Sequence, residues 1–229
     1  MGQKIDFPPH HTLPEFADVK QDVLTQLRAE RLIAIVRADA GDALVDIARA
    51  LSRGGISFLE IAMTTPAAVS TLEKASRELR AFRFGLGTVM DVETARLGVL
   101  AGASFIVTPS PRPDVITLCR RYHVAVISGA FTRADIAAAH AAGADAVKVF
   151  PGEEFGPAYV RTLKTATPEV QLVPIGGVTS QTVAEFIRAG AMAAFAGSSL
   201  VEDEMLQRRD WDSVTERAKL FTQAIALVG

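Results

Sequence analysis

Short apolar runs recur at regular intervals along the chain and indicate its architecture. Their first residues are about 20 to 26 positions apart, which leaves room for one crossover helix between consecutive runs. We predict eight strands from these runs, at 32–36, 58–62, 83–87, 105–108, 124–128, 146–150, 172–175 and 193–196.

The segments between the runs carry the periodicity of helices. In the first of them, Leu44, Ile47 and Leu51 fall on one helical face, and Gly54-Gly55 marks the end. The same pattern predicts helices at 66–79, 92–100, 113–122, 132–142, 155–166 and 179–188. A helix at 13–30 precedes the first strand, and another at 211–227 follows the last.

Strands that alternate with helices are typical of α/β folds with parallel sheets. Eight such units favour a single (β/α)8 TIM barrel with an extra N-terminal helix. An open doubly wound sheet is the alternative, but the turn after the first strand lacks the Gly-x-Gly-x-x-Gly fingerprint. We therefore predict an irregular tail at 1–12 and one barrel domain at 13–229.

Composition and charge narrow the range of functions. Hydrophobic residues make up 49% and charged residues 22%, as is usual for a globular protein in water. The formal net charge of −2 gives no electrostatic basis for binding nucleic acid or an anionic membrane. A single cysteine, Cys119, excludes an internal disulfide. Neither a secretory signal nor an apolar run of about 18 residues is present, so we expect a cytoplasmic protein.

Lys148 lies within a predicted strand that should be buried away from water. Lysine is rarely buried without a partner. An amine that has lost its hydration favours the neutral form, which is a nucleophile toward carbonyl carbon. Lys148 is therefore a candidate Schiff-base residue. The alternative is a lysine on an edge strand whose head reaches solvent.

Glu60 is a second charged residue inside an apolar run, Phe58-Leu-Glu60-Ile-Ala62. A carboxylate beside a nucleophilic amine supplies the general acid and base that imine formation needs. The alternative is an ion pair with Lys148 or Arg37 that serves folding alone. Buried ion pairs often stabilise little more than apolar replacements, which favours the catalytic interpretation.

Two glycine-containing turns follow the seventh and eighth predicted strands. Gly176-Gly177 lets backbone N–H groups approach an anion, and Gly197-Ser198-Ser199 adds backbone donors and hydroxyls. Barrels often bind phosphate at this place. Ordinary turn chemistry is the alternative for either turn alone.

The remaining reactive residues show no such pattern. The histidines lack the spacing of a metal site, and we predict none. Cys119 is expected to be a small packing residue. Glu153-Glu154 and the charged stretch from Glu202 to Asp212 are expected to be solvated surface, although Asp203 and Glu204 could bind a ligand.

Five motifs in order resemble the family of 2-keto-3-deoxy-6-phosphogluconate and 4-hydroxy-2-oxoglutarate aldolases. They are Glu60-Ile-Ala-Met-Thr-Thr-Pro66, Gly85-Leu-Gly-Thr88-Val-Met, Phe105-Ile-Val-Thr-Pro109, Val147-Lys148-Val-Phe-Pro151 and Pro174-Ile-Gly-Gly177-Val. The resemblance spans about residues 32–200. It implies a class I aldolase on a (β/α)8 barrel that needs no cofactor.

The resemblance also implies a role for each matching residue. Lys148 would form the Schiff base with the 2-keto carbon, and Glu60 would shuttle protons through a water. Other residues would bind the substrate. Thr88 would hold its carboxylate, Pro109 and Phe150 would shape the pyruvyl pocket, and the phosphate would lie at Gly176, Gly177 and Ser198. Arg37 matches an arginine that is common at this place in relatives.

The chain departs from the 6-phosphogluconate pattern at three places. Thr64 stands where those enzymes have a carboxylate-binding arginine, so Arg37 could replace that contact. Ile175 removes a hydroxyl near the phosphate site, and Ser128-Gly129 stands where proline-glycine is common. The 6-phosphogalactonate branch also lacks the arginine and shares a segment similar to Phe155-Gly156-Pro157-Ala-Tyr159, which favours that branch.

The sequence thus predicts an aldolase that releases pyruvate and glyceraldehyde 3-phosphate from a 2-keto-3-deoxy-6-phospho sugar acid of galactonate or gluconate type. One alternative is the same chemistry on unphosphorylated 4-hydroxy-2-oxoglutarate. Another is a phosphosugar-binding barrel without catalysis. The family resemblance implies a homotrimer.

Overall fold

Eight strands and ten helices alternate over the part of the chain that the structure, a computed structural model, describes: residues 14–36 and 43–228. The strands are β1 Leu32–Val36, β2 Phe58–Ala62, β3 Arg83–Gly87, β4 Phe105–Thr108, β5 Ala125–Ala130, β6 Ala146–Val149, β7 Leu172–Pro174 and β8 Ala194–Ala196. The helices are α1 Pro14–Glu30, α2 Leu44–Arg53, α3 Ala68–Glu78, α4 Val92–Leu100, α5 Pro113–Arg121, α6 Arg133–Ala141, α7 Gly152–Ala166, α8 Val183–Arg188, α9 Asp203–Arg208 and α10 Trp211–Ala226.

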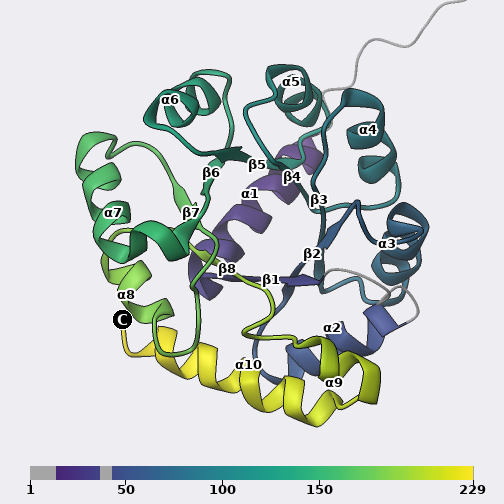
Figure 1. Ribbon diagram of the computed structural model, residues 1–229. Helices are drawn as coiled ribbons and strands as arrows, with labels where there is room; N and C mark the ends of the chain where they lie inside the picture. The colour runs from purple at the N-terminus through teal and green to yellow at the C-terminus, as the bar shows by residue number, and fades with distance from the viewer. Residues whose placement is uncertain (1–13, 37–42, 229) are drawn as a thin grey trace, which may run out of the picture.

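The strands form one parallel sheet that curls into a barrel (Figure 1). Their order is β7-β6-β5-β4-β3-β2-β1-β8, and each strand pairs with its neighbours in parallel. An isolated parallel bridge between Ile175 and Phe195 joins the two ends of the sheet. The predicted (β/α)8 barrel is therefore confirmed.

Alternation along the strands separates two apolar cores. Outward side chains such as Leu59, Leu86 and Val147 pack against the surrounding helices. Inward side chains such as Phe58 and Phe105 fill the barrel, with their ring centroids 6.0 Å apart. Both faces of each strand are thus buried, which explains the continuous apolar runs in the sequence.

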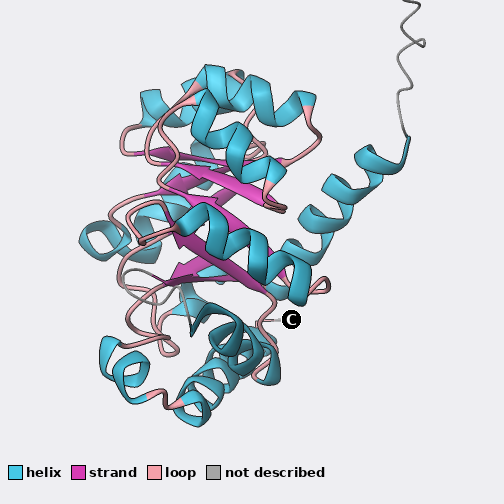
Figure 2. Ribbon diagram, turned by 90° about the vertical axis from the view of Figure 1, so that its right-hand side faces the viewer, coloured by secondary structure: helices cyan, strands magenta, loops and turns pink. Residues whose placement is uncertain are grey.

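The N-terminal helix α1 closes one end of the barrel. Val23, Leu24 and Leu27 are buried in the same cluster as the inward side chains. Lys20 adds an ion pair of 2.7 Å with Asp145, just before β6. Figure 2 shows α1 at the end of the barrel opposite to the arrowheads of the strands. The C-terminal ends of the strands are left for a site.

Several element boundaries differ from the prediction. α7 begins at Gly152 rather than 155, because a short first turn precedes a break at Gly156 (φ 61°), beyond which the helix continues from Pro157. α8 begins at Val183 rather than 179, because a hydrogen-bonded turn around Thr182 occupies the preceding residues. α9 was not predicted at all: it buries no side chain and so leaves no apolar period.

One predicted segment lies outside the described residues. The tail at 1–12 lies there, so the domain boundary at residue 13 stays a prediction. Within the described ranges, no helix is both long and apolar enough to cross a membrane.

Candidate active site

Lys148 and Glu60 meet inside the barrel, although they come from strands on opposite sides of it. Both follow inward-facing residues at alternate positions, Ala146 on β6 and Phe58 on β2. Nζ of Lys148 lies 3.6 Å from Oε2 of Glu60, and the two side chains are 15% and 2% exposed. β6 is paired on both sides, by β5 and β7, so the interpretation of Lys148 as an edge-strand residue is wrong.

The surroundings of this pair are apolar and incompletely hydrogen-bonded. The ring of Phe195 lies 4.8 Å from Nζ of Lys148. Oε2 of Glu60 is buried and accepts no hydrogen bond from any described residue. A buried polar atom of this kind is costly unless a water or ligand group satisfies it. At 3.6 Å, Nζ and Oε2 are too far apart for a strong direct hydrogen bond, and a water between neighbouring groups could carry a proton.

The turns after β2, β3 and β4 place three further predicted residues on the same rim. Thr88 is half-buried and has a φ of 60°, a left-handed conformation that is rare for a β-branched residue. Such strain clusters at functional sites. Pro109 and Thr64 are exposed at the ends of their strands. Arg37, the remaining predicted residue of this rim, lies outside the described residues.

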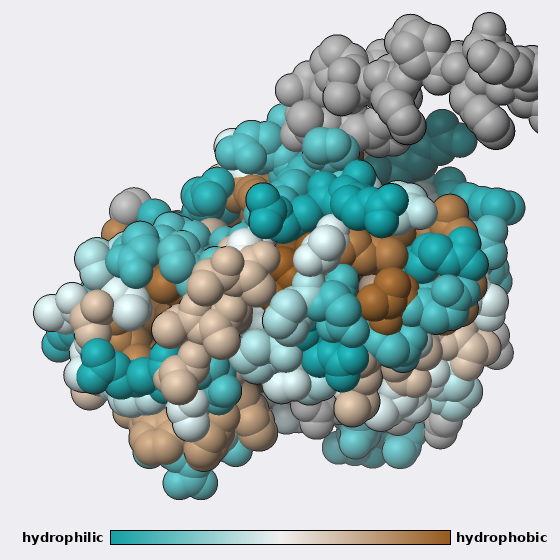
Figure 3. All heavy atoms as spheres, turned by 90° about the horizontal axis from the view of Figure 1, so that it is seen from above, coloured by the Kyte–Doolittle hydropathy of each residue, from teal (hydrophilic) through white to brown (hydrophobic). Residues whose placement is uncertain are grey.

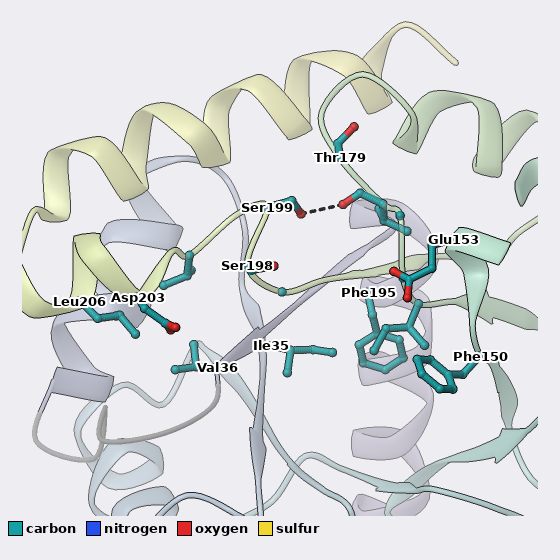
Figure 4. Close-up of a pocket in the computed structure, with 16 residues that line it drawn as sticks. Ile35, Val36, Phe150, Glu153, Thr179, Phe195, Ser198, Ser199, Asp203 and Leu206 are labelled. Atoms are coloured by element: carbon teal, nitrogen blue, oxygen red, sulfur yellow. Dashed lines mark hydrogen bonds between the residues drawn. The ribbon is translucent and has the colours of Figure 1, made fainter.

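A cavity of about 650 Å³ opens beside this pair, over the turns that follow β7 and β8 (Figure 4). Gly176 and Gly177 line it with φ angles of 95° and 65°, which glycine adopts without strain. Ser198 and Phe150, two further residues predicted to bind substrate, also line it. Ser199 Oγ donates a 2.6 Å hydrogen bond to the carbonyl of Val178, which fixes the two turns to each other.

Two carboxylates also line this cavity: Glu153, which was expected on solvated surface, and Asp203, for which the sequence left ligand binding open. Glu153 follows β6, and its Oε2 lies close against Gly176. Asp203 belongs to α9 on the other side of the cavity (Figure 4). The position of Glu153 directly after the strand of Lys148 was a usable signal, because that places it on the rim. Asp203 offered no such signal.

The cysteine and the possible metal ligands form no second reactive site among the described residues. Cys119 is buried, as expected of a packing residue, and burial raises the pKa of its thiol to about 12. Among the residues described, no group of three or more histidines, cysteines and carboxylates is arranged to hold a metal ion.

Comparisons with known proteins agree with this geometry. The family model "Aldolase: KDPG and KHG aldolase" matches residues 23–217. The 2-dehydro-3-deoxy-phosphogluconate aldolase of Treponema pallidum (strain Nichols) is 31% identical over 208 residues, covering 90% of this chain and 98% of that protein.

Solved structures give the same result. One described as native KDPGal is 28% identical with a TM-score of 0.80, covering 86% of this chain and 95% of that one. The KDPG aldolase from Legionella pneumophila, with pyruvate captured as a covalent carbinolamine intermediate, is 25% identical with a TM-score of 0.77, covering 89% and 96%.

Proposed function

The chain belongs to the KDPG and KHG aldolase family, and we propose that it cleaves a 2-keto-3-deoxy-6-phospho sugar acid through a Schiff base on Lys148. It is a lyase that breaks a carbon–carbon bond, and the products are pyruvate and glyceraldehyde 3-phosphate. The observation that carries the proposal is the pairing of Lys148 with Glu60 at the open end of the barrel.

Lys148 acts as the nucleophile and then as the electron sink. Its neutral amine attacks the C2 carbonyl to give a carbinolamine, which loses water to give a protonated imine. The electron pair of the C3–C4 bond moves into the imine when the C4 hydroxyl loses its proton. The aldehyde leaves, and an enamine remains on Lys148. Protonation at C3 and hydrolysis of the imine release pyruvate and restore the amine.

Glu60 moves the protons in these steps. Its buried Oε2 has no hydrogen-bond partner among the described residues, so it is available to a water or to a substrate hydroxyl. The carboxylate accepts the proton of the C4 hydroxyl and returns one to C3 of the enamine, in each case by way of a water. Apolar neighbours such as Phe195 exclude bulk solvent from these transfers.

The remaining residues orient the substrate. Thr88 binds the substrate carboxylate, and Pro109 and Phe150 enclose the pyruvyl half. The phosphate lies at the glycine-rich turns, where Gly176, Gly177 and Ser198 offer backbone N–H groups and a hydroxyl. Arg37 supplies the carboxylate contact that Thr64 cannot make.

Trapping the imine tests this proposal directly. The protein is incubated with pyruvate and borohydride, which reduces an imine to a stable amine, and the adduct is mapped by mass spectrometry. We expect one adduct, on Lys148. Lys148→Ala should abolish it, and Lys219→Ala, on exposed Lys219 of α10, should leave it unchanged. Formation of the adduct in Lys148→Ala would show that another amine does the chemistry.

The substrate class is tested separately. The gluconate and galactonate epimers of the phosphorylated substrate differ at C4, and 4-hydroxy-2-oxoglutarate lacks the phosphate. We expect a higher kcat/KM for the phosphorylated substrates and, from the residues at Thr64 and Phe155–Tyr159, for the galactonate epimer. Faster cleavage of 4-hydroxy-2-oxoglutarate would replace the phosphosugar assignment with the unphosphorylated one.

We also infer a homotrimer, in keeping with the family resemblance. Leu97 and Leu100 are exposed on α4, and Met90 is exposed just before it. Figure 3, which looks onto the side of the barrel with α5 and α6, shows apolar patches among hydrophilic side chains. Light scattering should give three times the chain mass of 24.4 kDa. The cytoplasmic location stays a prediction.

A further inference from the structure

Three consecutive acidic residues at the start of α9 have different surroundings. Glu202 pairs with Arg217 (Oε1 to Nη1, 2.7 Å), and Glu204 pairs with Arg208 (Oε1 to Nη2, 2.7 Å). Asp203, between them, has no ion pair or side-chain hydrogen bond with any described residue. It is instead the one of the three that lines the cavity beside the active site.

The cavity extends from Phe195, the ring beside Lys148, to Asp203. Phe195, whose ring lies 4.8 Å from Nζ of Lys148, lines one part of it with Phe150. Figure 4 shows Asp203 at the other side, with its carboxylate directed into the cavity and Ser198 between the two sides. A substrate bound through C2 to Lys148 therefore extends its C4 to C6 half along this cavity.

The chemistry of a carboxylate determines what it can accept there. An ionised carboxylate accepts hydrogen bonds and donates none, so it matches a hydroxyl group and opposes a second carboxylate. The hydroxyls of a sugar acid are donors of this kind. The two substrate classes differ at C5, which is a carboxylate in 4-hydroxy-2-oxoglutarate and carries a hydroxyl in the phosphorylated sugar acid, whose own anion is the phosphate on C6.

We propose that Asp203 is a specificity-determining residue that accepts a hydrogen bond from the C5 hydroxyl in the aldehyde half of the substrate. It thereby favours polyhydroxylated 2-keto acids over 2-keto dicarboxylates. The proposal rests on the aldolase function proposed above. It does not depend on which C4 epimer is preferred, because both epimers carry the same C5 hydroxyl.

Asp203→Asn tests this role, because the variant keeps the side-chain volume and loses the charge. Glu204→Gln is the matched control: it neutralises the next residue of α9, which pairs with Arg208 away from the cavity. Both variants remove one negative charge from the first turn of α9. An effect of that charge on the stability of the helix would therefore appear equally in both.

The measurement is kcat and KM for a phosphorylated sugar acid and for 4-hydroxy-2-oxoglutarate. Loss of a charge-assisted hydrogen bond should raise KM for the sugar acid about tenfold in Asp203→Asn, with a smaller change in kcat. KM for 4-hydroxy-2-oxoglutarate should stay equal or fall. Glu204→Gln should leave both substrates as in the wild type.

Three outcomes would overturn the proposal: unchanged kinetics in Asp203→Asn, an equal loss for both substrates, or the same loss in Glu204→Gln. The borohydride adduct of pyruvate on Lys148 separates this failure from failure of the proposed function. Pyruvate lacks the aldehyde half, so Asp203→Asn should form the adduct as the wild type does. Absence of the adduct in the wild type would instead refute the Schiff base itself.

Discussion

Gly87 stands directly against the carboxylate of Glu60. The two residues lie on neighbouring strands, and a Cβ at position 87 would overlap the Oε1 of Glu60. The barrel interior around them is filled, so the carboxylate has little room to move aside. The glycine in Gly85-Leu-Gly-Thr88 therefore has a steric reason: it leaves space for the proposed proton-transfer residue.

Gly87→Ala should displace Glu60 and so impair catalysis. A shift of about 1 Å in a reacting group can lower a rate by roughly 100-fold, and we expect a loss of that order in kcat. Pyruvate release coupled to lactate dehydrogenase measures it. The variant should also unfold at a lower urea concentration, because overpacking typically costs about 1–3 kcal/mol.

A double variant separates the displacement of Glu60 from general damage to the barrel. Glu60→Ala removes the atoms that the new Cβ would meet, so Glu60→Ala/Gly87→Ala should be destabilised less than the two single changes predict together. It should remain inactive. Additive destabilisation would show that the new methyl group meets something other than Glu60.

Glu60→Gln should leave the fold intact and slow the proton transfers. Glutamine has nearly the same shape but cannot take up the proton of the C4 hydroxyl. General acid–base catalysis contributes about 10²- to 10⁴-fold, and kcat should fall within that range. Borohydride trapping of pyruvate on Lys148 should become slower but still occur. A fall of less than about fivefold in kcat would remove Glu60 from the mechanism.

Much of this site follows from the sequence because of how barrels are built. Lys148 and Glu60 interrupt apolar strands, and alternation turns both inward at the same end of the barrel. The glycines at 176 and 177 could be assigned to the cavity for a similar reason, since their turn follows a predicted strand.

The parts that could not be predicted lack a periodic signal. α9 has six residues and no fully buried side chain, and only Met205 and Leu206 pack partly against the core, which is too short a pattern to give a helical period. Asp203 lines the cavity while Glu202 and Glu204 on either side of it pair with Arg217 and Arg208, and no pattern in the sequence distinguishes these three neighbouring carboxylates. The pairing distance of Lys148 and Glu60 likewise depends on barrel closure, which no local pattern specifies.

Leu27→Ala should destabilise the barrel although the residue belongs to the extra N-terminal helix. Leu27 is 2% exposed and packs in the interior cluster, so the change should cost about 2–5 kcal/mol in urea unfolding. Val19→Ala, on the same helix but 52% exposed, should change the free energy by less than about 0.5 kcal/mol. Equal costs would show that α1 does not contribute to the core.

The capping box of α6 should add stability that depends on pH. Backbone N–H groups of Thr132 and Phe131 donate to Asp135, and these bonds lower the pKa of that carboxyl below its ordinary value of 3.8. A carboxyl whose pKa is lowered on folding stabilises the folded state at pH values above its ordinary pKa. This contribution is lost as the pH falls through the lowered pKa. Asp135→Asn should therefore unfold at a lower urea concentration than the wild type at pH 7. The difference between the urea midpoints of the two proteins should become smaller below pH 3.8. A difference that does not change with pH would exclude this linkage.

Cys119 should report unfolding through its reactivity. The thiol is buried on α5, and burial, with a smaller contribution from Asp145, raises its pKa to about 12. Since the thiolate is the reactive form, iodoacetamide at pH 8 should label almost none of the native protein. Labelling should rise along the urea transition followed by circular dichroism, because the unfolded thiol regains an ordinary pKa and access to solvent. Rapid labelling without urea would mean that α5 opens locally, at a lower free energy than global unfolding. In that case the destabilised Leu27→Ala variant should label no faster than the wild type.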